Sequence, residues 1–115
     1  MKHRIIKALR EAKKTIETVG WAKGQFHGED GGCCTLTALR LAYSLCVYDD
    51  SEDAEFEAYW LTCQNFCRAN NIPFMENVPR EDENIAGWND LEGVSQYVVL
   101  NAFDKAIALT ERLKQ

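Results

Sequence analysis

The stretch MKHRIIKALREAKKTIETVG (residues 1–20) carries the periodicity that decides the fold class. Its apolar residues recur at steps of three and four, which places them on one face of a helix while charged residues fill the other positions. Gly20 suits the C-terminal end of such a helix. The stretch therefore predicts an amphipathic helix with one buried face, formed by Ile5, Leu9, Ala12, Ile16 and Val19.

The same periodicity recurs further along the chain, and no alternation typical of strands competes with it. Helix start signals precede the later segments, because Asp50, Ser51 and Ser95 are residues that cap helix N-termini. Three further helices are expected: from Cys33 or Thr35 to about Tyr48, from Asp50 or Ser51 to the ANNIP segment (residues 69–73), and from Ser95 to about Leu113.

Residues 73–93 predict a long irregular connection, with at most a short helical turn around residues 82–87. Long connections in small domains are usually held by their own side chains, and Trp21 and Trp88 are the natural anchors of the two long loops. The sequence therefore predicts an all-α fold: one domain over residues 1–115, built as a bundle of four main helices with two Trp-anchored loops.

Composition argues against several classes of protein. The 115 residues are 46% hydrophobic and 27% charged, with a formal net charge of −5, and this acidity argues against non-specific binding to nucleic acid. No stretch approaches the roughly 18 apolar residues of a membrane span, and residues 1–20 do not resemble a secretory signal. A cytoplasmic protein is expected. Its five cysteines are then expected to be reduced thiols, with Cys46, Cys63 and Cys67 as small buried residues.

The loop WAKGQFHGEDGGCC (residues 21–34) contains residues that could form several kinds of chemical site. Cys33 or Cys34, at a helix N-terminus, could act as a nucleophile with His27 as its base. A zinc site could use His27, Cys34, Cys63 and Cys67, although tight ligand pairs such as C-x-x-C are missing. We therefore expect neither a metal nor a cofactor.

Anion binding by the glycine pair at residues 31–32 is a weaker possibility, because the lysine of a P-loop is missing and Glu29 and Asp30 would repel an anion. A purely structural interpretation is favoured instead. In it the glycines allow sharp turns, while Trp21 and Phe26 anchor the loop to the core.

The stretch IAGWND (residues 85–90) also has a structural and a functional interpretation. Asn89 and Asp90 favour turns through hydrogen bonds from side chain to backbone. The functional interpretation is a shared pocket between this loop and the first one. Its expected ligand-binding residues are Trp21, His27, Cys34, Trp88, Asn89 and Asp90.

Four short motifs resemble a family of small uncharacterised domains from bacterial and phage genomes: W-x-x-G (Trp21, Gly24), C-x-x-T-A-L (Cys34 to Leu39), W-N-D-x-x-G-x-S (Trp88 to Ser95) and F-D-K-A-I (Phe103 to Ile107). The chain has Thr37 where that family usually has glycine, and Val94-Ser95 where it usually has Arg-Thr. The missing arginine puts a shared anion-binding function in doubt. The resemblance implies a domain of unknown function, with structural residues along the fold and no established reaction.

Two functions of different classes follow from these observations. The first is a non-catalytic binding or regulatory protein, of the kind with which a phage or mobile element modulates a host system. It would contact a basic protein partner through acidic residues that include Asp49, Asp50, Glu52 and Asp53. The alternative is a site for a small nucleotide-like ligand, or a Cys/His thiol enzyme, in the pocket between the two loops.

Overall fold

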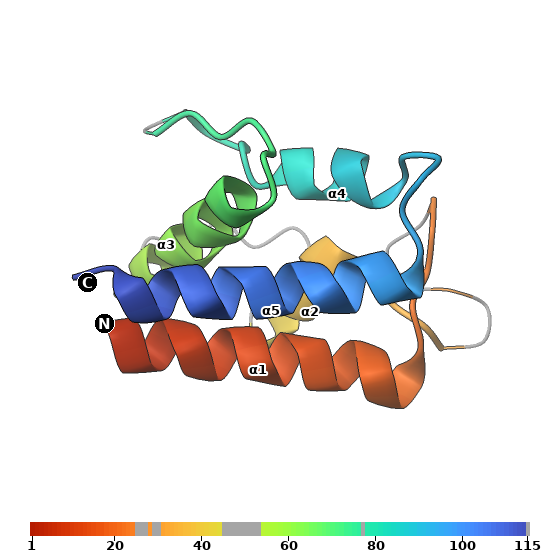
Figure 1. Cartoon of the computed structure of the whole chain (residues 1–115), viewed down its shortest axis with the longest axis horizontal. Coiled ribbons are helices and arrows are strands. Elements are labelled where there is room, and N and C mark those ends of the chain that lie inside the picture. The colour runs from red at the N-terminus through yellow and green to blue at the C-terminus, as the bar shows by residue number, and fades with distance from the viewer. Residues whose placement is uncertain (25–27, 29–30, 45–53, 77, 115) are drawn as a thin grey trace.

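The computed structural model describes residues 1–24, 28, 31–44, 54–76 and 78–114. Within these residues the regular elements are five helices (Figure 1), and Trp21 and Cys33 add one isolated parallel bridge. None of the described helices is long and apolar enough to span a membrane. The helices are α1 (Lys2–Val19), α2 (Thr35–Leu41), α3 (Ala54–Ala69), α4 (Glu83–Asn89) and α5 (Gln96–Arg112).

Helices α1 and α5 lie side by side and run in opposite directions, so that the two termini meet at one end of the molecule (Figure 1). The predicted apolar face of α1 is buried at Ile5, Leu9, Ala12 and Ile16, whereas Val19 is 44% exposed. Helices α2 and α3 complete the core. Its largest fully buried apolar and aromatic side chains are Tyr59, Phe66, Phe103, Ile5, Leu9, Ile16, Leu36, Leu39, Ile85 and Val99.

The helix ends follow local chemistry. The hydroxyl oxygen of Ser95 accepts a hydrogen bond from the amide of Val98 at 3.3 Å, which caps α5 as predicted. Gly20, with φ of 95°, ends α1, and Asn71 adopts a left-handed backbone (φ 56°) just after α3. Glycine adopts a positive φ readily because it lacks a Cβ, and asparagine adopts the left-handed region more often than most other residues do. The sequence therefore marked the boundaries of α1 and α5 and the end of α3.

Two expectations about the helices need correction. The second helix ends at Leu41 instead of near Tyr48, and a turn follows in which Ser44 has φ of 58°. The hydroxyl of Tyr43 donates a hydrogen bond to the Ala58 carbonyl at 3.2 Å, so this turn is fixed against α3. The short helical turn expected at residues 82–87 is a complete helix, α4, which gives five helices instead of four main ones. The predicted start of the third helix, at Asp50 or Ser51, lies outside the described residues.

We predict that Phe103→Ala lowers the free energy of unfolding by about 3–5 kcal/mol. Phe103 is fully buried and packs on Phe66 with ring centroids 5.0 Å apart, so truncation leaves a cavity in the core. Urea denaturation followed by circular dichroism measures the change. Tyr97→Ala is the matched control on the same helix, because Tyr97 is 79% exposed. Equal effects of the two substitutions would contradict this core.

Candidate functional site

Asn89, the last residue of α4, lies fully buried where the two Trp-bearing loops meet. Its Oδ1 accepts hydrogen bonds from the Trp21 indole Nε1 at 2.6 Å, the Thr35 amide at 3.0 Å and the Thr35 hydroxyl at 2.7 Å. Its Nδ2 donates to the Ala22 carbonyl at 3.0 Å and to Asp90 Oδ1 at 3.0 Å. Both ends of this amide are thus fully used by the chain itself.

Two surface residues extend these contacts. Asp90 Oδ1 also accepts a hydrogen bond from the Gly24 amide at 2.7 Å. The ammonium group of Lys23 donates to the Leu91 carbonyl at 2.7 Å and to the Val94 carbonyl at 3.3 Å. The segment that follows α1 is therefore held against the turn that follows α4. We call this set the Asn89 junction; it consists of Trp21, Ala22, Gly24, Thr35, Asn89 and Asp90.

Cys34 lies beside the junction as the N-cap residue of α2. Its sulfur accepts a hydrogen bond from the Thr37 amide at 3.4 Å and lies 3.3 Å from the Thr37 hydroxyl oxygen. Cys34 is 3% exposed and Cys33 is 2% exposed. Burial, with a smaller contribution from neighbouring Cys34, raises the pKa of the Cys33 thiol from 9.0 to about 11. Neither sulfur is presented to solvent as a nucleophile.

Trp88 faces a different part of the molecule. Its ring packs edge-on against Phe66 with centroids 5.6 Å apart. It also lines a hollow of about 310 Å³ between α4 and the segment after α3, together with residues that include Ile72, Pro73 and Leu91. Trp21 is not among the lining residues. Of the six predicted ligand-binding residues, the structure brings Trp21, Cys34, Asn89 and Asp90 together at the start of α2, and it sets Trp88 on a separate hollow.

The remaining predicted residues lie outside the part of the chain that the structure describes. They are His27 of the ligand-binding set and all four acidic residues of the predicted partner surface: Asp49, Asp50, Glu52 and Asp53.

A second buried polar cluster escaped the sequence analysis. Asp82, only 2% exposed, accepts hydrogen bonds at Oδ2 from Arg40 Nη2 at 2.6 Å and from the Tyr59 hydroxyl at 2.5 Å. The guanidinium carbon of Arg40 lies 5.7 Å from the centroid of the Tyr59 ring. The only signal in the sequence was a single arginine within the apolar stretch TALRLAY (residues 37–43). This cluster joins α2, α3 and the start of α4.

Burial and the Asp82 carboxylate raise the pKa values of two cysteines on α3, Cys63 and Cys67. Cys63 is fully buried, and this burial, together with the nearby Asp82 carboxylate, raises its pKa well above 9.0. Burial also raises the pKa of Cys67 to about 12. Both thiols are therefore protonated at neutral pH. Among the described residues, no three His, Cys, Asp or Glu side chains are grouped so that they could hold a metal ion.

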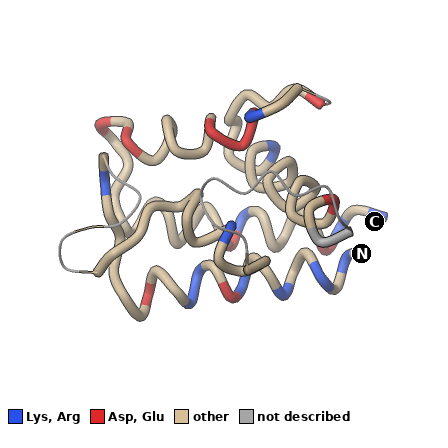
Figure 2. The backbone as a smooth tube through the Cα atoms, turned by 180° about the vertical axis from the view of Figure 1, so that it is seen from behind, with Lys and Arg blue, Asp and Glu red and all other residues tan. Residues whose placement is uncertain are grey.

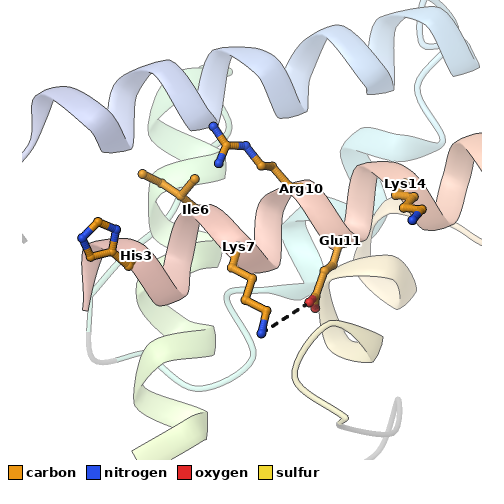
Figure 3. A pocket seen from close by; sticks show the side chains of 6 residues that line it. All are labelled: His3, Ile6, Lys7, Arg10, Glu11 and Lys14. Atoms are coloured by element: carbon orange, nitrogen blue, oxygen red, sulfur yellow. Dashed lines mark ion pairs between the residues drawn. The ribbon is translucent and has the colours of Figure 1, made fainter.

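Another hollow, of about 270 Å³, lies on the outer face of α1. Its lining includes the side chains of His3, Lys7, Arg10 and Lys14, which extend from α1 (Figure 3). Lys7 lies 4.0 Å from Glu11, and Arg10 reaches across to Glu111 of α5 at 3.6 Å. Acidic neighbours thus offset much of the positive charge, which makes this face a poor anion site.

Residues 1–109 match the model of a family of unknown function, DUF6197. The chain therefore belongs to this family, as the resemblance to a domain of unknown function had indicated. No curated protein and no solved structure matches the chain.

We predict that Asn89→Ala destabilises the protein by at least about 3 kcal/mol, because it leaves the Trp21 indole and the Thr35 amide without their acceptor. Urea denaturation measures the loss. Asn101→Ala provides the matched control, since Asn101 is exposed on α5. A loss of less than about 1 kcal/mol for Asn89→Ala would contradict the junction.

We predict that iodoacetamide labels Cys33, Cys34, Cys63 and Cys67 about 100-fold more slowly in the native protein than in urea. Burial withholds all four sulfurs from the reagent, and three of the thiols also have raised pKa values. Peptide mass spectrometry at pH 7.5 gives the rate for each residue. Fast native labelling of Cys34 would instead support the thiol-enzyme alternative.

Proposed function

We propose that the chain is a non-catalytic binding or regulatory module that acts through a protein partner. The observation that carries this proposal is the Asn89 junction. Asn89, Trp21 and Asp90 are the residues whose chemistry best suits a ligand site, yet the Asn89 amide, the Trp21 indole N–H and one carboxylate oxygen of Asp90 bond to one another and to the backbone. A small ligand would have to break these contacts before it could use them.

The distribution of charge supports a basic partner. Helix α1 holds six Lys or Arg residues and two Glu residues, whereas the rest of the chain holds seven Lys or Arg and sixteen Asp or Glu. Outside α1 the protein is therefore strongly acidic. Such a surface raises the rate of encounter with a positively charged protein and repels nucleic acid and other acidic partners. Modulation of a host system by a phage or mobile element is the biological setting that we propose for such a module.

The contact region within this proposal includes Asp49, Asp50, Glu52 and Asp53. The alternative, a nucleotide-like ligand or a thiol reaction at the two loops, has less support, because Cys33 and Cys34 are buried and the Asn89 amide is fully bonded.

We predict that a tagged wild-type protein captures a specific partner from host lysate at low salt. Replacing Asp49, Asp50, Glu52 and Asp53 by lysine should weaken this capture by about tenfold or more, because the attraction to a basic surface becomes repulsion. Raising the salt concentration should weaken wild-type capture as well. Quantitative mass spectrometry of the eluted proteins measures both effects.

Cys34→Ser serves as the control in the same experiment. It alters the α2 cap and the predicted thiol site but leaves the acidic residues in place, so capture should persist. If Cys34→Ser abolishes capture while the fourfold lysine variant retains it, the binding proposal fails and the thiol site is favoured.

A further inference from the structure

The hollow that Trp88 lines has the features of a docking surface. It lies between α4 and the segment that follows α3. Ile72, Pro73, Trp88 and Leu91 supply apolar surface, and Asn71, Glu83 and Asn84 supply polar groups. Leu91 is 57% exposed beside a partly buried tryptophan ring. Large apolar side chains gathered around a concave surface are typical of sites that receive a side chain from a partner.

Trp88 also carries a polar group, its indole Nε1. Among the hydrogen bonds of the described residues, none involves its indole Nε1, in contrast to the Trp21 indole, which is bonded to Asn89. An aromatic ring with an available donor is a common anchor in protein interfaces, because it combines a large apolar area with one directional contact.

Gly87 is one of the residues that line the hollow. It occupies the interior of α4, where alanine is preferred over glycine because it costs less backbone entropy. Its φ is not in the left-handed region, and a Cβ at this position would meet no atom within 4 Å. Neither backbone geometry nor packing therefore requires glycine here. Because Gly87 lines the hollow, a larger side chain at this position would fill part of it.

The charge around α4 identifies the kind of partner. Residues 74–95 contain six acidic residues and a single basic one, Arg80, and Figure 2 shows acidic residues at both ends of α4. Asp82 is buried against Arg40, Glu83 lies 3.1 Å from Arg80, Glu76 lies 3.4 Å from Arg68, and Lys23 contacts the Leu91 carbonyl. Asp90 and Glu92 are exposed and form no ion pair with another described residue, so they leave the rim acidic. An apolar hollow with an acidic rim complements a basic segment that carries a large apolar side chain.

We propose that the hollow formed by Ile72, Pro73, Gly87, Trp88 and Leu91 docks a basic peptide segment of the partner and receives one of its large apolar side chains. This inference rests on the proposed function, because it names the chemistry of the partner and the surface that holds it. The acidic residues around α4 attract the segment, and the Trp88 ring supplies the anchor.

Selection from a library of random twelve-residue peptides displayed on phage, against the immobilised full-length protein, tests this proposal. The enriched peptides should combine an excess of Lys and Arg with at least one large apolar residue. One enriched peptide, synthesised with a fluorescent label, then gives dissociation constants by anisotropy. Gly87→Leu should weaken its binding by about tenfold or more, because the new side chain occupies the hollow.

Gly93→Leu is the matched control, because Gly93 also has open space around it but does not line the hollow. It should change the affinity less than about twofold. Leu91→Ala is a second test variant, and its exposure ensures that the fold survives the change. It should also weaken binding by severalfold, and circular dichroism confirms that each variant is folded.

The outcomes separate this inference from the proposed function. If a basic peptide binds Gly87→Leu and Leu91→Ala as tightly as wild type but is lost from the variant with lysine at positions 49, 50, 52 and 53, the hollow is not the docking surface and the proposed function stands. If the library yields no basic peptide, or yields acidic ones, both are overturned.

Discussion

The side-chain amide of Asn89 is the contact on which the arrangement of the other elements depends. It sits at the end of α4 and bonds to the segment after α1 through Trp21 and Ala22, and to the first residue of α2, Thr35. A buried amide is costly unless each of its donors and acceptors finds a partner. Here every one does, so a single side chain fixes three segments that are distant in the sequence.

Helix α4 shows why such polar contacts are needed. It is seven residues long, and only Ile85 and Asn89 are fully buried in it, while Ala86 and Trp88 are partly buried against the core. Apolar packing therefore holds this short helix only in part. Asn89 secures its C-terminal end, and Asp82, bonded to Arg40 and Tyr59, secures its N-terminal end. Buried ionic contacts of this kind add little net stability, whereas removing one partner is costly because the other charge is left buried without a counter-charge. With both ends held, the outer side of α4 is free to form the hollow around Trp88.

The sequence predicted those parts of the fold that bury one face of a helix. Periodicity located α1 and α5 closely, because their apolar residues recur at helical steps and capping residues mark their ends. Periodicity placed the end of α2 near Tyr48, which is too late. Apolar residues continue on all sides past Leu41, and a uniformly apolar segment does not show where its helix ends. Periodicity predicted at most a short helical turn where α4 lies, because only two residues of this helix are buried and two positions do not define a repeat.

The sequence identified several residues of the candidate site but not the contacts between them. Trp21, Asn89 and Asp90 were recognised as unusual loop residues, and a structural role in turns was foreseen for the last two. Their partners could not be foreseen, because the contacts of Asn89 span 68 residues to Trp21 and 54 residues to Thr35. Likewise, the sequence places Arg40 and Asp82 on segments 42 residues apart, with nothing to indicate that they pair. Contacts of this range are set by how the helices pack.

Trp21, Asn89 and Asp90 resemble a ligand site but hydrogen-bond to one another and to the backbone. A double-mutant cycle on Trp21→Phe and Asn89→Ala, measured as free energies of unfolding in urea, tests this arrangement most directly. We expect a coupling energy of about 1 kcal/mol or more, because both substitutions remove the same hydrogen bond between the indole donor and the amide acceptor. Effects that add within about 0.3 kcal/mol would show that the two side chains act independently, and would return them to the list of candidate ligand-binding groups.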